Sequence, residues 1–321
     1  MSAPSHSEPA APPRPARWWY HRLALLLSLA TLILLGAGAL VVGTGSSLAV
    51  PDWPLAYGQV FPPMVGGILF EHGHRLIASS VGLLTLILAA WLRFAEPRRW
   101  VRYLAVGALA LVILQGLLGG ITVLLLLPKA ISIGHALAAQ AFFALTVLLA
   151  QGTSPGWERL AAQAQAPAGA RNLAAASLAA VVCAVALGAV VRHYNAGLAI
   201  PDFPLAYGAL IPPLSAFPIL IHFLHRVAAL AAALLVIWTA WRFRGLPGPL
   251  ARPAWFLLGC LLLQWALGAA VIWSARELIV TTLHLVNGAL LLGAAGLLVL
   301  RAWAGRAAAR TGAAAAPSTA A

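Results

Sequence analysis

Charged residues are scarce in this chain, because Asp, Glu, Lys and Arg make up only 8% of its 321 residues. Hydrophobic residues make up 62%, and the mean hydropathy is +0.92. A soluble globular domain typically contains about 25% charged residues. The composition therefore excludes a soluble protein and predicts an integral membrane protein.

Cysteine is also scarce: Cys183 and Cys260 each lie in the middle of an apolar run. Two such distant residues form no disulfide framework, and the sequence has no Cys-x-x-Cys-His motif for covalent heme attachment. We expect both cysteines to be small buried hydrophobic residues.

Acidic residues number 7 against 20 basic ones, which gives a net charge of +13. In a soluble protein this charge would suggest a nucleic-acid partner. Here the basic residues sort between alternate loops, so the sequence predicts membrane lipid and no nucleic acid. One set of loops carries Arg14, Arg17, Arg22, Arg93, Arg98, Arg99, Arg102, Arg159, Arg171, Arg242, Arg244, Arg252, Arg301, Arg306 and Arg310. The other set carries Arg75, Lys129, Arg192, Arg226 and Arg276. The positive-inside rule places the first set and both termini in the cytoplasm.

Long apolar runs are the most prominent feature that the chain does have. Eight of them are long enough to cross a hydrocarbon core about 30 Å thick. They cover residues 23–43, 65–92, 102–127, 131–151, 172–192, 215–241, 253–274 and 279–301. The first is too long for a cleavable signal, whose apolar region has about 7–15 residues. The sequence therefore predicts a multi-pass, all-α protein with eight transmembrane helices.

A repeat divides these helices into two groups of four. The segment from Leu48 to Gly58, L-A-V-P-D-W-P-L-A-Y-G, recurs from Leu198 to Gly208 as L-A-I-P-D-F-P-L-A-Y-G. A period of about 150 residues marks duplication of a whole bundle. Because each repeat has an even number of spans, both halves should lie the same way up, related by a pseudo-twofold axis along the membrane normal.

This repeat predicts the domain boundaries. We expect an N-terminal four-helix bundle over residues 19–151, a cytoplasmic linker over 152–171 and a C-terminal four-helix bundle over 172–303. The Ala- and Pro-rich residues 1–18 and 304–321 are predicted to be disordered cytoplasmic tails.

Four histidines occur at matched places in the two repeats: His74, His135, His225 and His284. An imidazole inside a membrane helix is costly unless it is paired or ligated. The second and fourth helices of each bundle run in the same direction, so their histidines could face each other and ligate a heme iron from both sides. A zinc site would need three or four close ligands. The alternative is that each histidine only forms a hydrogen bond between helices.

The remaining histidines receive lesser roles. His72 lies about 200° around the helix from His74, so we expect it at the rim of the bundle. His222 shares a face with His225 and could form a hydrogen bond near the second site. His193, in an outer loop, is assigned no role.

Arg75 and Arg226 each follow one of the matched histidines, near a helix N-terminus where the dipole disfavours a cation. An anion is therefore expected beside each, and heme propionates suit the bidentate guanidinium. The alternative is an ion pair with Glu71, Asp52 or Asp202.

Glu71 distinguishes the two repeats, because its counterpart in the second is His222. This asymmetry suggests that one site holds a substrate while the other transfers electrons. The alternative is a carboxylate that merely favours a helix N-terminus. Gln115 and Gln264 could bond a ligand edge, with Gly119 and Gly268 admitting a flat ring, or could serve plain helix packing. The proline-rich loops could be stiff lids or structural turns.

The sequence from Gly43 to Arg301 resembles the heme A synthase family, whose members convert heme O to heme A for cytochrome oxidase. The resemblance rests on P-D-W-P-L, E-H-G-H-R, His135, A-G-L-A-I-P-D-F-P-L, His225-Arg226 and His284. It implies a substrate heme between His74 and His135 in the N-terminal bundle, and a heme b cofactor between His225 and His284 in the C-terminal bundle. Glu71 matches the family's catalytically important acid.

One departure concerns the outer loops, where many members carry a cysteine pair. Here those places hold Val50 and Ala56, with Ile200 and Ala206 in the second repeat. A thiol role in heme transfer or catalysis is therefore absent.

The sequence thus predicts an enzyme that oxidises a methyl group of heme O to the formyl group of heme A in the bacterial cytoplasmic (inner) membrane. Expected partners are heme O and its synthase, a quinol or redox protein as electron donor, and cytochrome oxidase assembly. A non-catalytic di-heme b-type cytochrome and a heme-delivery protein would use the same histidine ligands. Glu71 opposite His222 favours the enzyme, since an electron carrier has no evident need for that asymmetry.

Overall fold

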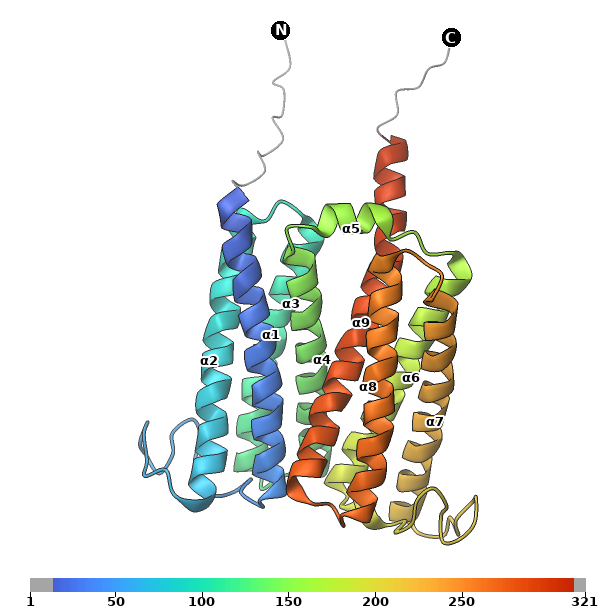
Figure 1. The fold of residues 1–321 in the computed structure, drawn as a ribbon. Helices are drawn as coiled ribbons and strands as arrows, with labels where there is room; N and C mark the ends of the chain where they lie inside the picture. Colours follow the sequence, from blue (N-terminus) through green and yellow to red (C-terminus); the bar gives the residue numbers. More distant parts are fainter. Residues whose placement is uncertain (1–13, 315–321) are drawn as a thin grey trace, which may run out of the picture.

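A computed structural model describes residues 14–314 of the chain. Its long elements are α-helices (Figure 1). They are α1 (Arg14–Gly43), α2 (Gly66–Ala95), α3 (Arg99–Leu124), α4 (Lys129–Thr153), α5 (Trp157–Gln163), α6 (Ala168–His193), α7 (Phe217–Phe243), α8 (Gly248–Trp273) and α9 (Leu278–Ala314), with a 3-10 turn η1 (Ala196–Leu198). All except α5 and η1 are long and apolar enough to cross a membrane, which gives 8 candidate spans. The predicted all-α, eight-span fold is confirmed.

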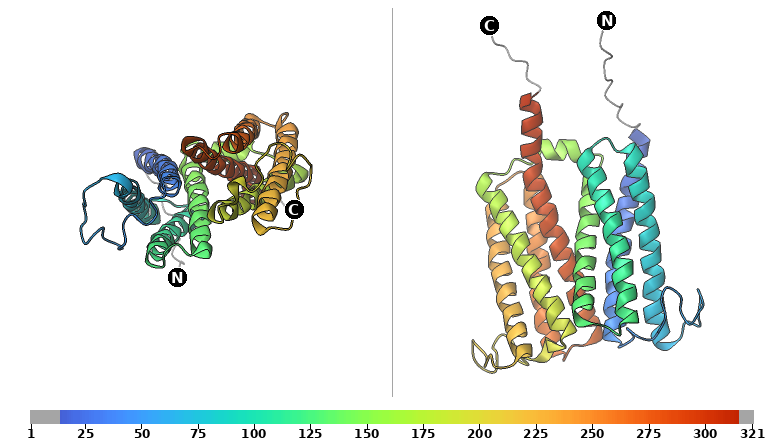
Figure 2. Two further views of the ribbon diagram at one scale, coloured as in Figure 1. Left: turned by 90° about the horizontal axis from the view of Figure 1, so that it is seen from below. Right: turned by 180° about the vertical axis from the view of Figure 1, so that it is seen from behind.

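The helices form two rings of four. In the first half α1 contacts α2, α2 contacts α3, α3 contacts α4, and α4 returns to α1; α6, α7, α8 and α9 repeat this order. Contacts of α1 and α4 with α9, and of α4 with α6, join the rings, which lie side by side in Figure 2. A pseudo-twofold axis that relates them is consistent with this order and stays a prediction.

The two ends of the molecule differ. The helix α1 begins and α9 ends on one side, here called the terminal end, where α5 also lies. The two long loops, residues 44–65 and 194–216, lie on the opposite side, here called the loop end (Figure 1). The repeated P-D-W-P and P-D-F-P segments therefore lie on the same side, as the even number of spans in each repeat requires.

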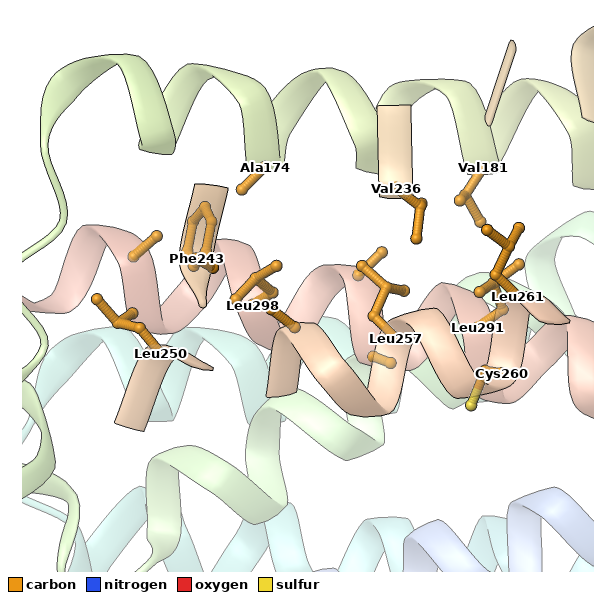
Figure 3. Packing of buried hydrophobic residues seen from close by; sticks show 14 of the residues in the cluster. Ala174, Val181, Val236, Phe243, Leu250, Leu257, Cys260, Leu261, Leu291 and Leu298 are labelled. Carbon is orange, nitrogen blue, oxygen red and sulfur yellow. The ribbon is translucent and has the colours of Figure 1, made fainter. Parts of the chain in front are cut away.

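The tightly packed apolar cores occupy the half of each bundle nearer the terminal end. In the second bundle, Val181, Val236, Leu257 and Leu298 belong to this core (Figure 3). The equivalent cluster of the first bundle includes residues 20–27 of α1, 81–92 of α2, 101–108 of α3 and 142–150 of α4. Alanines in both clusters allow the helix backbones to approach closely. This packing leaves the loop half of each bundle to other side chains.

Three sequence expectations need correction. The helix α1 begins at Arg14 and α9 continues to Ala314, so the predicted tails are wrong at residues 14–18 and 304–314. Pro15 is tolerated in the first helical turn, and the Ala-rich end of α9 has strong helix propensity. Residues 1–13 and 315–321 lie outside the described part. Cys260 is buried as expected, but Cys183 is exposed.

A buried ion cluster holds the terminal end of the first bundle together. Glu96 is 2% exposed and accepts hydrogen bonds from Arg98 at 2.6 and 2.9 Å and from the Tyr20 hydroxyl at 3.3 Å. Burial raises the pKa of Glu96, but the hydrogen bonds from Arg98 outweigh that effect and leave it below its usual value. This cluster ties α1 to the turn between α2 and α3.

Candidate functional site

The four matched histidines lie on α2, α4, α7 and α9, on the loop side of the apolar cores. In each ring they occupy the second and fourth helices. His74 and His135 thus lie on helices that are diagonally opposite in the first ring, and His225 and His284 on the corresponding helices of the second. This placement is compatible with the predicted pairs, and their joint ligation of a heme iron stays a prediction.

Each imidazole lies against a glycine of a neighbouring transmembrane helix. A Cβ atom added to Gly38 would lie 3.1 Å from Cε1 of His74, and one added to Gly188 would lie 3.1 Å from Cε1 of His225. The corresponding distance is 3.4 Å for Gly119 with His135 and for Gly268 with His284. Because glycine has no side chain, each imidazole ring packs directly against the backbone of the neighbouring helix.

The ring nitrogens of the second pair have polar partners. Nδ1 of His225 lies 3.0 Å from the Ala184 carbonyl oxygen, and donating there leaves the Nε2 lone pair free for a metal ion. The Gln264 amide nitrogen lies 3.2 Å from Nε2 of His284 and donates to the His284 carbonyl at 3.1 Å. Asn287 donates to the Gln264 amide oxygen at 2.7 Å, which fixes the amide.

The first pair differs in its ring nitrogens. Nδ1 of His135 is buried and has no hydrogen-bond partner within residues 14–314. The backbone of Leu34 lies beside the His74 ring, at the place that Ala184 takes beside His225, and a bond from Nδ1 there would leave the Nε2 lone pair for a metal ion. Gln115 donates to the His135 carbonyl oxygen at 3.0 Å. The amides of Gln115 and Gln264 thus donate to backbone carbonyls of the helices that carry His135 and His284. This is the role in helix packing that the sequence left open as an alternative.

The histidine pairs fit a metal whose remaining ligands come from another group. Within the described residues, no three or more His, Cys, Asp and Glu side chains group closely enough to hold a metal ion. Two axial imidazoles suffice for an iron whose other four ligands are porphyrin nitrogens. The donor set and the glycine-lined imidazoles therefore fit heme.

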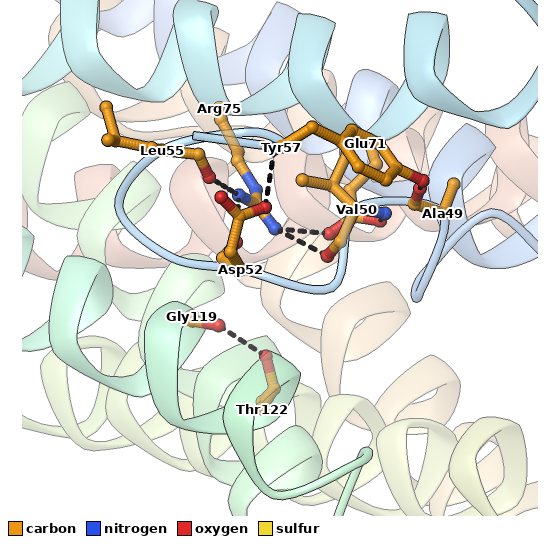
Figure 4. A network of polar contacts seen from close by, with 9 residues as sticks. All are labelled: Ala49, Val50, Asp52, Leu55, Tyr57, Glu71, Arg75, Gly119 and Thr122. Carbon is orange, nitrogen blue, oxygen red and sulfur yellow. Dashed lines mark hydrogen bonds and ion pairs between the residues drawn. The ribbon is translucent and has the colours of Figure 1, made fainter. Parts of the chain in front are cut away.

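The loop over the first pair has a fixed internal structure (Figure 4). The Asp52 carboxylate accepts hydrogen bonds from the backbone N–H groups of Tyr57 at 2.7 Å and Gly58 at 2.8 Å, and the Tyr57 hydroxyl donates to the Ala49 carbonyl at 2.6 Å. The N–H groups of Gly58 and Tyr57 lower the pKa of Asp52. The loop is a rigid turn rather than a flexible segment.

The second loop repeats this arrangement. Asp202 accepts from Tyr207 at 2.7 Å and Gly208 at 2.8 Å, and the Tyr207 hydroxyl donates to the Ala199 carbonyl. The N–H groups of Gly208 and Tyr207 lower the pKa of Asp202. The same chemistry in both repeats indicates a shared structural purpose.

Arg75 fastens the first loop to α2. Its guanidinium forms an ion pair with Glu71 at 2.6 Å and donates to the backbone carbonyls of Asp52 at 2.7 Å, Leu55 at 3.0 Å and Val50 at 3.2 Å. The pairing with Glu71 is the alternative weighed from the sequence. Contact with a heme propionate stays a prediction, as it does for Arg226, which donates to three carbonyls of the second loop.

Glu71 and His222 occupy the same structural position. A Glu71 carboxylate oxygen accepts the Val50 backbone N–H at 2.8 Å, and Nδ1 of His222 accepts the Ile200 backbone N–H at 3.3 Å. The two side chains are 4% and 5% exposed. Nε2 of His222 also receives a 3.4 Å contact from Arg226. Both residues anchor a loop, but only Glu71 can bring a negative charge.

His72 contradicts its predicted place at the rim. It is 4% exposed, and its Nε2 lies 2.9 Å from the Val60 carbonyl oxygen. The first loop folds back over the beginning of α2 and covers the side chain. The helical angle from His74 gave the correct face but could not predict what the loop covers.

Comparison with known proteins identifies the family of this chain. Residues 21–296 match the COX15-CtaA family, whose description is "Cytochrome oxidase assembly protein". The chain belongs to this family. A relative from Halalkalibacterium halodurans named "Heme A synthase" is 32% identical over 271 residues, covering 81% of this chain and 89% of the relative. Proteins of the same name from Symbiobacterium thermophilum (34% identity, 73% and 78% coverage) and a Methylobacterium strain (29%, 91% and 94%) are also similar.

Proposed function

We propose that this protein is a heme A synthase, which oxidises a methyl group of heme O to a formyl group. The observation that carries the proposal is the unequal pair of Glu71 and His222, set in otherwise matched loops beside matched histidines. Family membership and relatives named "Heme A synthase" support the same reaction.

The two bundles take different hemes in this proposal. His74 and His135 hold the substrate heme O as axial ligands, beside Glu71. His225 and His284 hold heme b, which supplies one-electron transfer when bound. The hydrogen bond of His225 with Ala184 keeps that imidazole in a fixed orientation. The Gln264 amide N–H would give up its contact with Nε2 of His284 when that nitrogen ligates iron.

Glu71 acts on the substrate side. The net change at the methyl group is –CH3 + H2O → –CHO + 4 H⁺ + 4 e⁻, with the electrons taken up by an external oxidant. It builds positive character at the carbon and releases protons, both of which a carboxylate can assist. The Val50 N–H and the Arg75 guanidinium hold the carboxylate in place at 2.8 and 2.6 Å. Because Glu71 lies three residues before His74 on α2, it shares the helix face of that ligand.

The protein works in the bacterial cytoplasmic membrane, with the terminal end in the cytoplasm and the loop end outside. The basic residues of the two ends support this orientation. Heme O would come from its synthase, a quinol or redox protein would exchange electrons at the second bundle, and the product would serve cytochrome oxidase assembly.

One observation favours a second candidate, a di-heme b-type cytochrome. The imidazole–glycine contacts are equal in the two repeats, at 3.1 and 3.4 Å, as two equivalent electron-transfer hemes would require. Such a protein would leave heme O unchanged.

Mass spectrometry of extracted hemes separates these candidates. A host that makes heme O but lacks its own heme A synthase should contain heme A only when it expresses this protein. A variant carrying both His74→Ala and His135→Ala serves as the matched control and should yield no heme A. Heme O without heme A in cells expressing the unmutated protein, given a competent electron-transfer chain, would favour the cytochrome.

A further inference from the structure

Four basic residues gather where the two bundles meet at the loop end: Lys129, Arg192, His193 and Arg276. Lys129 begins α4, Arg192 and His193 end α6, and Arg276 lies in the turn before α9. The Arg192 guanidinium donates to the Ala39 carbonyl oxygen of α1 at 2.9 Å. The Lys129 ammonium lies 4.4 Å from the centroid of the Tyr194 ring. We call these four residues the junction cluster.

The junction cluster is close to the first histidine pair. The Arg276 side chain reaches the chain that follows α6, because its Cδ atom would lie 3.3 Å from a Cβ atom added to Gly197. Lys129 precedes His135 on α4 by six residues, which is about 9 Å along a helix. The cluster therefore lies beside the first site, on its loop side.

The counterparts of Lys129, Arg192 and His193 in the other repeat carry no charge. By the register of the repeat, Arg192 corresponds to Val42, His193 to Gly43 and Lys129 to Leu278. Gly43 faces Leu278 in the contact of α1 with α9, which is the counterpart of the contact of α6 with α4. The contact of α1 with α9 is thus made by apolar residues. Helix packing alone therefore does not require basic residues in the corresponding contact of α4 with α6.

The acidic residues of the loop end are engaged elsewhere. Asp52 and Asp202 accept N–H groups of their own loops, and Glu71 pairs with Arg75. The Glu277 carboxylate accepts the backbone N–H groups of Ile279 and Val280 at 3.0 and 2.8 Å. Within residues 14–314, no ion pair involves Lys129, Arg192 or Arg276. Glu277 directly follows Arg276 and keeps its charge there, whereas Lys129 and Arg192 have no acid partner among the described residues, so an anion beside those two would be favourable.

We propose that the junction cluster binds the propionate carboxylates of the heme held by His74 and His135. The inference rests on the proposed function, since it takes that heme as the ligand. Both terminal nitrogens of Arg75 already donate to Glu71 and to loop carbonyls. Within the described residues, the Arg192 side chain makes one hydrogen bond and the Lys129 side chain makes none. The cluster therefore has the free donors that a carboxylate needs.

Esterified heme provides the direct test. Purified protein with its second site filled is titrated with ferric protoporphyrin IX and with its dimethyl ester, and binding is followed by the Soret band. The unmutated protein should bind the free acid about tenfold or more tightly than the ester, which is the size of a charge-assisted hydrogen bond. Arg192→Gln and Lys129→Gln should each weaken binding of the acid several-fold and leave ester binding unchanged.

Two controls separate the possible failures. Arg102→Gln, at the terminal end, should bind both compounds like the unmutated protein. Lys129 is exposed, so Lys129→Gln tests the cluster even if the partly buried hydrogen bond of Arg192 with Ala39 proves necessary for folding. Equal affinities for acid and ester in the unmutated protein would overturn the inference while leaving the proposed function intact. Binding of neither compound would overturn both.

Discussion

Position 71 combines a structural role with a chemical one. The Glu71 carboxylate anchors the first loop through Val50 and Arg75, and His222 anchors the second loop through Ile200 with an imidazole instead. A histidine can therefore serve as the anchor at this position. We infer that the negative charge, beyond its ion pair with Arg75, serves the reaction proposed for the first bundle.

Substitutions of Glu71 should separate these roles. Glu71→Gln and Glu71→His both keep an acceptor for the Val50 N–H, so we expect heme content to persist while heme A formation falls to background. Glu71→Ala leaves a buried N–H group unpaired and should also lower the free energy of unfolding by about 1–3 kcal/mol. Pyridine hemochrome assays, mass spectrometry of extracted hemes and thermal unfolding measure the three effects. Normal heme A yield from Glu71→Gln would remove the carboxylate from the mechanism.

The glycines beside the histidines give a second prediction at this scale. Gly38→Ala should reduce heme binding in the first bundle and Gly188→Ala in the second, because each new Cβ would lie 3.1 Å from an imidazole carbon. Gly82→Ala is the matched control on α2, since a Cβ there meets nothing within 4 Å and alanine favours a helix by about 1 kcal/mol. Absorption spectra of the purified variants report the occupancy of each site. Full occupancy in both variants would mean that the imidazoles have room to move.

Among the structural elements, the two loops depend on their aspartates. Asp52→Asn or Asp202→Asn replaces one carboxylate oxygen by an N–H donor, which would face the backbone N–H of Gly58 or Gly208. We expect each variant to lose amide protection in its own loop and to retain it in the other, so each loop serves as the control for its counterpart. Hydrogen–deuterium exchange of loop peptides at neutral pH measures this. Unchanged protection would show that the arginines hold the loops without the aspartates.

The same loops should respond to acid. The folded pKa values of Asp52 and Asp202 lie below the ordinary value of 3.8, because the N–H groups stabilise the carboxylate. Such a group stabilises the folded loop above its ordinary pKa, and this contribution disappears as the pH falls through the lowered folded value. Protection factors of the loops should therefore stay constant from neutral pH to about 5 and decline below about 4. A decline that begins near pH 6 would point to a histidine instead.

The sequence predicted the elements better than the contacts between them. Apolar runs gave all eight spans because hydropathy and length determine which segments cross a bilayer. The repeat also predicted matched places for the four histidines, and the structure has them on the second and fourth helices of each ring. The hydrogen-bond partners of Arg75 and the burial of His72 could not be predicted, because both depend on how a loop of irregular backbone folds over α2. The junction cluster comes from three separate places in the sequence, namely Lys129, the adjacent Arg192 and His193, and Arg276, so only the meeting of the bundles brings them together.

For the molecule as a whole, duplication explains the shared arrangement of the two bundles. The residues that differ between the two repeats suggest the function. Both rings repeat the same order of contacts, loop anchors and glycine-backed imidazoles. The differences concentrate at the loop end, where Glu71 replaces a histidine and the junction cluster replaces apolar residues. A bundle that admits and modifies a substrate needs such groups, whereas a bundle that only transfers electrons does not.

Orientation in the membrane is the final prediction, and it concerns the whole molecule. Basic residues are concentrated at the terminal end, where Arg98 and Arg242 lie, and the cytoplasmic side of a membrane protein carries that excess. Reporter fusions after Gly58 and Gly208 should therefore behave as periplasmic, and a fusion after Arg98 as cytoplasmic. Agreement between the first two fusions also tests the even number of spans between the repeats, because an odd number would place them on opposite sides. Signals of the reverse sense at all three positions would turn the molecule over and place Glu71, both histidine pairs and the junction cluster near the cytoplasmic face.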